Sequence, residues 1–339
     1  MAEVEITTEL QEIQSNLWGV NVRENIALAL EKLQNLPEEP NPIQGSLNLS
    51  LLDTASWKLG LLKNSIQGKE DTLQSRKDQL DRIKAKLEQV SGRTILQYGQ
   101  CGDDVYYAIC DDGEAALYGT GATYDYTFHD SVFYQNGQIK KIVLSNGITG
   151  LGDRLFYHCA NAETVSLPAT LTSIGDSAFA QEDAAIGYTA GLTSVTIPQA
   201  VTVIQSYAFY HTAIAEVTVP ASVKTWGKYA FSGCAKLKTA RVACDSIGAF
   251  AFTRCTALSS LTISANCRTF GENMLTYCES LTAITYEGTI AQWNAITKPV
   301  NWMSSGEHSY NNYLKKIQCV DGYLEYDPEN NVWNEVKNG

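Results

Sequence analysis

One block recurs through the second half of the chain, with the pattern LxxVxIPxxVxxIGxxAFxxC. Each copy contains a short run of alternating apolar residues, which predicts a β-strand. The expected strand cores begin at Ile142, Val165, Val195, Val217, Ala240, Leu261 and Ile284, so successive copies are 21 to 30 residues apart. A strand of this length cannot bury its own apolar face, but stacking successive copies buries all of them. The block therefore predicts a solenoid with the period of a leucine-rich repeat.

Three further positions of the repeat stay apolar, which predicts three ladders in the solenoid core. The first ladder comprises Ile148, Leu171, Val201, Val223, Cys244 and Cys267. The second comprises Leu151, Ile174, Ile204, Trp226, Ile247 and Phe270. The third comprises Phe156, Phe179, Phe209, Phe231, Phe252 and Leu275.

Glycine and proline recur at fixed places in the repeat. Glycine follows the second ladder at Gly152, Gly175, Gly227, Gly248 and Gly271, and Gln205 takes that place in the remaining copy. Glycines at a fixed place are typical of a tight turn with positive φ, which is the conformation we expect there. Pro168, Pro198 and Pro220 are expected to end strands, because proline cannot donate to a ladder.

The block resembles the BspA-like leucine-rich repeat family, tandem repeats that occur in bacterial surface proteins, adhesins and some phage proteins. The resemblance covers most of residues 92 to 326. The stretch GQCGDDVYYAICDDGEAALYGTGATYDY (99 to 126) is similar to the N-terminal cap of such arrays, and ITYEGTIAQWNAITKPVNW with IQCVDGYLEY (284 to 326) resembles their closing unit. The family implies recognition of a partner without saying which one.

These signals divide the chain into five parts of an α+β protein. Residues 1–45 are expected to form a docking helix and a Pro-rich linker, and 46–91 a helical, coiled-coil stalk. Residues 92–138 are expected to form a β-rich cap, 139–286 the repeats, and 287–339 a C-terminal cap and tail.

Composition restricts the partners. The chain of 339 residues has a formal net charge of −12, so it lacks the basic footprint of a nucleic-acid-binding protein. It contains no apolar run of eighteen or more residues, so we expect no membrane insertion. The N-terminus MAEVEITTELQEIQ carries acidic residues where a signal peptide has a basic region, so we expect no export by the standard route.

Nine cysteines are present, an odd number that agrees with synthesis in a reducing compartment. Cys159, Cys234, Cys255 and Cys278 close the AFxxC block. We interpret the cysteines as small buried apolar residues. Disulfides between rungs stay an alternative, because rungs about 4.8 Å apart fall within disulfide range. Zinc is disfavoured, because CxxC pairs are missing.

The N-terminal segment predicts a short amphipathic helix. Asn21 and Glu24 form a capping-box pattern before VRENIALALEKLQNL, and Pro37 ends that segment. Its apolar face is the expected docking surface. That face comprises Val22, Ile26, Leu30 and Leu33, with Ala29 between them.

A charged segment from Lys69 to Val90 has the spacing of a coiled coil. Leu73, Leu80 and Leu87 lie one heptad apart, and Ile83 and Val90 occupy the alternate seam position. Leucine at one seam position with isoleucine at the other favours more than two strands, so we expect a trimer. A single helix packed on its own chain stays the alternative, because the segment has only about three heptads.

A docking helix, a stalk and a distal recognition domain together suggest a fibre. The leading hypothesis is a phage virion protein, a tail-fibre, receptor-binding or head-fibre subunit, that binds a host surface protein or glycan and contacts other virion proteins through its N-terminus. NVRENIALALEKL weakly resembles phage attachment segments. The alternatives are a bacterial cell-surface adhesin of the BspA-like kind and an intracellular interaction scaffold.

Catalysis is not expected, and no cofactor or metal is predicted. His129, His158, His211 and His308 belong to no catalytic fingerprint, and His158 and His211 are expected to face solvent at turns. The carboxylates Asp103, Asp104, Asp111, Asp112 and Glu114 match no calcium loop. The DDG sequence among them instead predicts a hairpin turn.

Two regions are candidate partner-binding sites. The second complete repeat is enlarged, and its insertion offers Gln181, Glu182, Asp183 and Tyr188, although a loop without a role is the alternative. The second region is an aromatic group in the N-terminal cap, suited to polar partners such as sugars. That group comprises Tyr106, Tyr107, Tyr118, Tyr124, Tyr126, Phe128, Phe133 and Tyr134, of which half or more are expected only to seal the solenoid. Tyr124 and Tyr126 are the preferred contacts.

Overall fold

The computed structural model describes residues 74–75, 77–78, 81, 94–181, 190–303, 313–327, 329–330 and 332–338. The chain divides into two compact units, Met1–Lys77 and Asp78–Gly339, and every described strand lies in the second. The predicted docking helix and the seam residues of the predicted stalk, Leu73, Leu80, Ile83, Leu87 and Val90, lie outside the described residues. Before Thr94 the description is limited to five helical residues: Gln74, Ser75, Lys77, Asp78 and Asp81.

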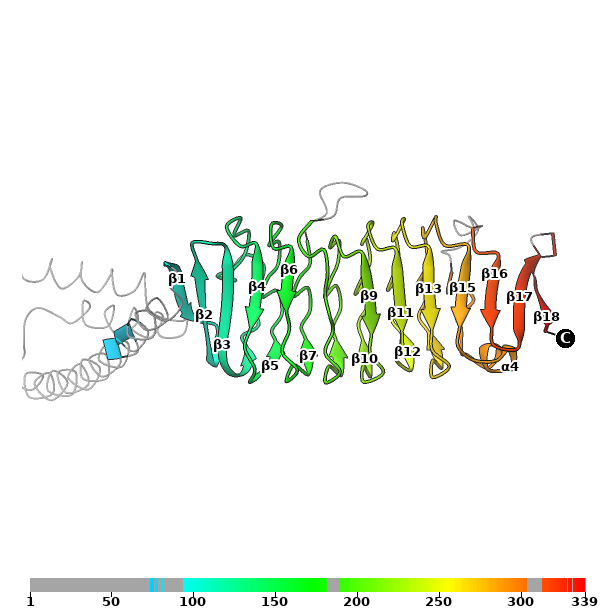
Figure 1. Cartoon of the computed structure of the whole chain (residues 1–339), viewed down its shortest axis with the longest axis horizontal. Coiled ribbons are helices and arrows are strands. Elements are labelled where there is room, and N and C mark those ends of the chain that lie inside the picture. The colour runs from blue at the N-terminus through cyan, green and yellow to red at the C-terminus, as the bar shows by residue number, and fades with distance from the viewer. Residues whose placement is uncertain are drawn as a thin grey trace, which may run out of the picture. The chain divides into compact units, whose positions relative to one another are not determined.

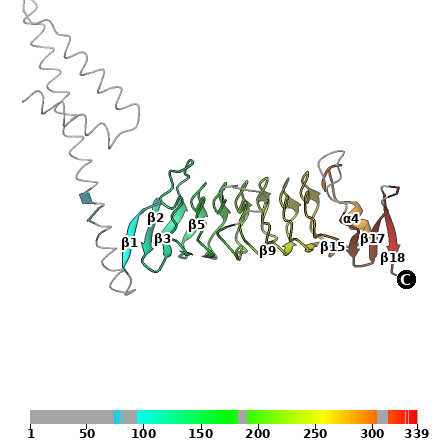
Figure 2. The same cartoon turned by 90° about the horizontal axis from the view of Figure 1, so that it is seen from above.

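The second unit is a β-solenoid, as predicted, in which each repeat forms one rung (Figures 1 and 2). On one side of the rungs, Ile142 is in register with Val165, and Val217, Ala240, Leu261 and Ile284 are in register with one another, which confirms six of the seven predicted strand starts. The strand expected at Val195 was wrong, because that copy makes only an isolated bridge between Ser194 and Thr164. This side is therefore divided between two sheets. Its strands are β4 (Lys141–Leu144), β6 (Thr164–Ser166), β9 (Glu216–Val219), β11 (Thr239–Val242), β13 (Ser260–Ile263), β15 (Ala283–Tyr286) and β16 (Lys316–Cys319).

A second row of short parallel strands carries the second predicted ladder. Leu151, Ile174, Ile204 and Trp226 are in register along it, and all four are buried. The strands are β5 (Ile148–Leu151), β7 (Ser173–Ile174), β8 (Val203–Ile204), β10 (Thr225–Trp226), β12 (Ser246–Ile247) and β14 (Thr269–Phe270). In Figure 1 this row lies toward the lower end of the rungs.

A third row consists of turns stacked from rung to rung, and we call it the turn ladder. Each of five consecutive rungs donates three backbone N–H groups to carbonyl groups of the next rung, as when Tyr207, Phe209 and His211 donate to Lys228, Ala230 and Ser232. All fifteen bonds run in the same direction along the solenoid. The turns are therefore hydrogen-bonded from rung to rung through the backbone, as strands are, although they are not extended.

The glycines after the second ladder were predicted to adopt positive φ, and this prediction was wrong. None of Gly152, Gly175, Gly227, Gly248 and Gly271 has positive φ. A Cβ at Gly227 would instead lie 2.2 Å from the backbone nitrogen of Ser206, and one at Gly152 would lie 2.0 Å from the carbonyl oxygen of Tyr124. Glycine is required there because the backbones of adjacent rungs approach too closely for a side chain.

The core is formed by the predicted ladders. Phe156, Phe179, Phe209 and Phe231 are at most 1% exposed. Their rings stack with centroid separations of 5.0 to 5.5 Å. Leu275 continues the same column. All nine cysteines are buried and free, which confirms their interpretation as buried apolar residues.

Two caps close the solenoid. At the N-terminal end, β1 (Ile95–Gln100), β2 (Gly102–Cys110) and β3 (Glu114–Thr123) form an antiparallel meander, and β3 pairs in parallel with β4. At the other end lie the helix α4 (Ile290–Asn294), β17 (Gly322–Asp327) and β18 (Val332–Lys337). Thr289 and Gln292 form a capping box at the start of α4, and Trp293 of that helix is buried.

Candidate functional site: an aromatic surface on the turn ladder

One position of each rung in the turn ladder combines positive φ with a side chain outside the Phe column. It lies two residues after the glycine position, and its φ is between 52° and 60° in every rung. The residues at this position are Arg154, Ser177, Tyr207, Tyr229, Phe250 and Asn273. A left-handed conformation is unfavourable for residues other than glycine. Hydrogen bonds of the turn ladder maintain the left-handed conformation here. The backbone N–H of each of these residues donates to a carbonyl oxygen one repeat further along the chain.

Three neighbouring rungs place aromatic rings at this position. Tyr207 and Tyr229 stack with centroids 4.9 Å apart and planes at 8°, and Tyr229 and Phe250 stack at 4.4 Å and 11°. These separations match the rung spacing of about 4.8 Å, so the solenoid itself aligns the rings. Tyr207 is 37% exposed, and the other two are half-buried. We call these three residues the aromatic stack.

A second aromatic group lies on the N-terminal part of the same turn ladder. Tyr134 and Tyr157 stack at 5.9 Å with planes at 10°. The guanidinium of Arg154 lies over the ring of Phe128, 4.5 Å from its centroid, and Phe128 is 58% exposed. This contact is a cation–π interaction.

The rung between the two groups has small side chains. Ser177 occupies the position of Arg154 and Tyr207, and Ala180 occupies that of Tyr157 and Tyr210. Polar groups gather beside Ser177. The Oγ of Ser177 donates to Oδ1 of Asp176 at 2.7 Å, and Nη2 of Arg154 donates to the same oxygen at 3.4 Å.

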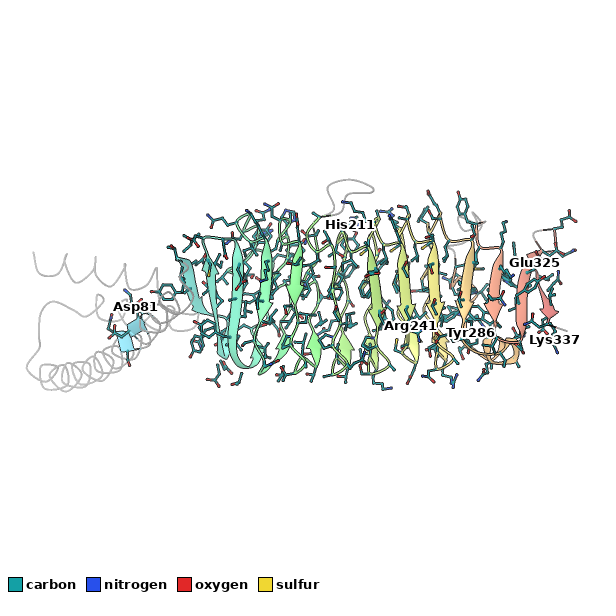
Figure 3. All side chains as sticks on the ribbon, viewed as in Figure 1. Asp81, His211, Arg241, Tyr286, Glu325 and Lys337 are labelled. Atoms are coloured by element: carbon teal, nitrogen blue, oxygen red, sulfur yellow. The ribbon has the colours of Figure 1, made fainter. Side chains whose placement is uncertain are left out.

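The sheet on the other side of the rungs has a different surface. Its outward positions are mostly polar, with Thr218, Thr262 and Thr285 aligned beside Arg241. Arg241 forms a two-pronged ion pair with Glu287. Figure 3 shows Arg241 on the strand layer, and His211 at the upper edge of the solenoid. Within the described residues, the aromatic side chains outside the core lie on the turns and on both caps, where the C-terminal cap contributes the Tyr326–Trp333 pair.

The residues predicted from the insertion are only partly described. Gln181 is 2% exposed, and its Nε2 donates to the carbonyl oxygen of Phe179 at 3.2 Å. A residue buried in this way is suited to support the turn rather than to contact a partner. Glu182, Asp183 and Tyr188 lie outside the described residues.

The aromatic residues predicted in the N-terminal cap differ in exposure. Tyr107 and Phe133 are buried in the core and pack edge to face, with centroids 5.0 Å apart. Tyr126 is half-buried against the core, and burial raises its pKa. Tyr124 is 41% exposed. Of the two preferred contacts, Tyr124 is thus the more accessible.

The histidines and acidic residues were candidates for chemistry. His158 and His211 lie at turns, but the expectation that both face solvent was wrong, because His211 is 2% exposed and packs on Tyr210. Gly233 leaves room for it, since a Cβ there would lie 2.1 Å from the His211 ring. His308 lies outside the described residues.

The acidic DDG segment forms the predicted hairpin turn between β2 and β3. The carboxylate of Asp112 accepts from the N–H of Glu114 at 3.1 Å, and Gly113 has a φ of 86°. Across the ranges that the structure describes, no group of three or more His, Cys, Asp or Glu side chains is arranged to hold a metal ion. Nor do those ranges contain a helix long and apolar enough to cross a bilayer.

The thiols are poorly suited to nucleophilic chemistry. Burial raises the pKa of Cys159, Cys267 and Cys278 to about 12, and that of Cys244 to about 11. These thiols are protonated at neutral pH, and the thiolate is the reactive form.

Sequence reasoning missed the aromatic stack. A signal was present, because an aromatic residue stands two places before the Phe column in three successive repeats. Those residues are Tyr207, Tyr229 and Phe250. The same place holds Arg154, Ser177 and Asn273 in other repeats, so no common character marks the column until the rungs are stacked.

Comparison with known families agrees with this fold. The family described as the BspA type leucine-rich repeat region matches residues 126–186 and 182–297, with six copies. Together the two matches span just over half of the chain. The chain therefore belongs to the BspA type leucine-rich repeat family. No curated protein matches it.

Several solved structures are similar to the solenoid. A leucine-rich repeat protein from Eubacterium ventriosum is 17% identical, covers 66% of this chain and 93% of its own, and has a TM-score of 0.27. The T. pallidum leucine-rich repeat protein is 20% identical, with coverages of 55% and 87% and a TM-score of 0.37. A leucine-rich cell surface protein from Faecalibacterium prausnitzii is 16% identical, with coverages of 60% and 97% and a TM-score of 0.29. These scores are low, so the assignment rests on the family match.

Proposed function

We propose that this chain is a non-enzymatic binding protein that acts at a bacterial cell surface and recognises a macromolecular partner through its turn ladder. The observation that carries the proposal is the aromatic stack of Tyr207, Tyr229 and Phe250, in which three rings on adjacent rungs remain partly exposed. Family membership supports a role in surface binding, because the resemblance to BspA-like repeats implies bacterial surface proteins and adhesins.

Core packing determines some side chains of the turn ladder and leaves others free to vary. Packing in the core requires a large apolar side chain in the Phe column. The position of Tyr207, by contrast, is occupied by Arg, Ser, Tyr, Phe or Asn in different rungs. Core packing therefore does not require three aromatic rings there. Exposed tyrosines are enriched where proteins bind partners, since the ring buries apolar area while the hydroxyl keeps a hydrogen bond.

A role in catalysis is disfavoured by the chemistry of the side chains present. The buried thiols are protonated at neutral pH, because burial raises their pKa to about 12, and they are poor nucleophiles. We therefore keep the interpretation of a binding module.

The virion hypothesis finds no support in the comparisons, since the family match begins at residue 126 and leaves the N-terminal segment unmatched. We keep as proposals the trimeric stalk, the docking face and a contribution of the insertion to binding. An intracellular scaffold is the remaining alternative, and it differs in expecting a protein partner from the same cell.

A cell-binding assay tests the proposal. The fluorescently labelled full chain would be measured by flow cytometry on a panel of bacterial and mammalian cells, beside a variant with Tyr207, Tyr229 and Phe250 all changed to Ser. The matched control changes Glu216, Thr239 and Ser260 to Ala, because these exposed residues are in register on the opposite sheet. We expect the aromatic variant to lose binding and the control to keep it. Equal binding by the two variants would contradict the role of the turn ladder, and no binding to any cell would contradict a surface function.

A further inference from the structure

The last strand of the solenoid has a free edge. β18 ends the sheet that also contains β9, β11, β13, β15, β16 and β17, and among the described strands it pairs only with β17 (Figure 1). Six consecutive residue pairs join the two strands without a bulge. Five of the six residues of β18 are exposed, and Trp333 is half-buried. The strand therefore presents a regular row of backbone groups on the side away from β17.

The hydrogen bonds of the cap identify the residues that face this edge. The N–H of Asn338, directly after β18, donates to the carbonyl oxygen of Asp321, on the side of β17. In an antiparallel pair, successive residues direct their backbone N–H and C=O groups to opposite sides. Every second residue before Asn338 therefore bonds to β17, and the residues between them face the free edge. The edge residues are Trp333, Glu335 and Lys337.

β18 lacks several features that protect edge strands. Natural edges are often interrupted by proline, twisted by a bulge or covered by another element. β18 contains no proline, and its pairing with β17 is regular. Val332 and Val336 of this strand are 45% and 37% exposed. The carboxylate of Glu335 accepts a hydrogen bond from Nδ2 of Asn294 at 2.8 Å, so this charge is held on the side of α4. The edge is therefore open to pairing with another strand.

We propose that β18 pairs with β18 of a second copy of this chain, antiparallel and about a twofold axis between their Asn334 residues. The N–H and C=O groups of Trp333 in each copy bond to those of Glu335 in the other. The contact joins the C-terminal ends of two solenoids and continues the sheet from one copy into the next. This inference goes beyond the proposed function and does not rest on it.

Side-chain chemistry selects this register. With Asn334 on the axis, Val332 of each copy lies opposite Val336 of the other, so the pairing covers both exposed valines. Moving the axis by one residue toward the C-terminus places Glu335 opposite Glu335, and like charges directly opposite each other are destabilising. Moving it by one residue the other way leaves Val336 opposite a residue before the start of the strand.

The contact is small. Two strands of six residues bury less than the roughly 1,600 Å² of a standard interface, so we expect a dissociation constant in the micromolar range or weaker. None of the residues of the predicted stalk takes part in it. A covalent trap is therefore a better probe of this contact than the mass of the chain in solution.

The first test introduces a cysteine on the axis, Asn334→Cys. In the proposed pair the two new residues are a non-hydrogen-bonded pair with Cα atoms about 4.5 Å apart, which is within disulfide range. The control is Glu325→Cys, because Glu325 is exposed and pairs with Asn334 on β17. Two copies of Glu325 are three strand spacings, or about 14 Å, apart in the proposed pair. The nine native cysteines are buried and present in both variants.

Both full-length variants would be incubated at high concentration with oxidised glutathione and followed on non-reducing gels. Two thiols are oxidised to one disulfide, and oxidised glutathione is reduced to two molecules of glutathione. We expect Asn334→Cys to form a covalent dimer at least about tenfold faster than Glu325→Cys, because strand pairing holds its thiols together. Equal rates for the two variants, or no dimer from Asn334→Cys, would overturn the proposal.

A second test adds charge to the strand in the Asn334→Cys chain. Val332→Lys with Val336→Lys places like charges opposite each other across the axis. The matched control, Val300→Lys with Val320→Lys, changes two exposed valines outside β18. We expect cross-linking to slow by at least about tenfold in the first variant, since the thiols are no longer held together, and to stay rapid in the control. Equal cross-linking by the two variants contradicts the register.

A third test concerns the backbone. Glu335→Pro removes an N–H that faces the other copy and leaves the bonds to β17 in place, because proline is tolerated where the N–H of an edge strand faces solvent. Glu335→Ala keeps that N–H. In the Asn334→Cys chain, we expect slow cross-linking with proline and rapid cross-linking with alanine. Circular dichroism melts verify that the variants fold. Rapid cross-linking by the folded proline variant would show that the copies do not pair through their backbones.

Discussion

The thiol of Cys255 donates a hydrogen bond to the carbonyl oxygen of Phe231 in the preceding rung, with a distance of 3.2 Å between Sγ and the oxygen. The same bond joins Cys159 to Phe133 at 3.0 Å and Cys278 to Phe252 at 3.2 Å. The final cysteine of the AFxxC block thus links four of the turns to the preceding rung. In one rung without this cysteine, Thr212 takes its place, and its hydroxyl donates at 2.9 Å to Phe209 of its own rung, whose carbonyl oxygen also accepts from Cys234 of the next rung.

The effect of substituting Cys255 on the free energy of unfolding should therefore depend on the loss of the hydrogen-bond donor as well as on the loss of side-chain volume. Cys255→Ala removes both, and we expect it to lower the free energy of unfolding by about 1 to 3 kcal/mol. Cys255→Ser keeps a hydroxyl donor at the same place and should be less destabilising. Denaturant titration of both variants measures the difference. A serine variant that is less stable than the alanine variant would show that the hydrogen bond contributes nothing.

Thiol reactivity provides a second prediction. Because burial raises the pKa of Cys159 and Cys278 to about 12, almost no thiolate forms at pH 8 in the folded chain. Ellman's reagent should react slowly with the native protein and rapidly with all nine cysteines after unfolding in guanidinium chloride. Rapid reaction of several thiols without denaturant would mean that the cysteine column is not packed as described.

The glycines after the second ladder should resist substitution for a reason other than φ. Gly227→Ala places a Cβ 2.2 Å from the backbone of Ser206, so the rungs must move apart. We expect a loss of about 1 to 3 kcal/mol or more. Gly137→Ala is the control, since its Cβ would meet only the Asn161 side chain at 3.5 Å. Thermal melts in which both variants match the unmodified chain would exclude the close approach of rungs.

Much of this fold follows from the sequence, because the alternation of apolar residues determines the strand register. Val217 and Ala240 are paired as their places in the repeat predict. The role of Gly227 could not be predicted, because it arises from the backbone of another rung rather than from the local conformation. His211 illustrates the same limit, since its burial depends on Gly233 in the following rung.

The candidate site was less accessible to sequence reasoning than the fold. Tyr124 was identified because aromatic residues are dense in the N-terminal cap, and it is exposed. Tyr207 and Tyr229 are 22 residues apart in the chain and form a contact only through stacking of the rungs. Asp176 and Arg154 meet for the same reason. Such pairs become visible when residues are compared column by column rather than along the chain.

Assembly through the predicted stalk is an independent prediction. Changing Leu80 and Leu87 to Asn would bury amides in the seam and should convert a trimer to a monomer. Sedimentation velocity measures the mass, and circular dichroism verifies that the solenoid stays folded. An unmodified chain that is monomeric at high concentration would contradict the coiled-coil prediction.

The central claim is that the turn ladder is the recognition surface, and hydroxyl-radical footprinting of the chain bound to cells tests it most directly. Mass spectrometry would compare oxidation of each residue in the free and bound chain. We predict protection of Tyr207, Tyr229 and Phe250, with unchanged oxidation of Tyr323 and Val332 in the C-terminal cap. Protection of the cap, with the three rings of the aromatic stack oxidised equally in both states, would contradict the account.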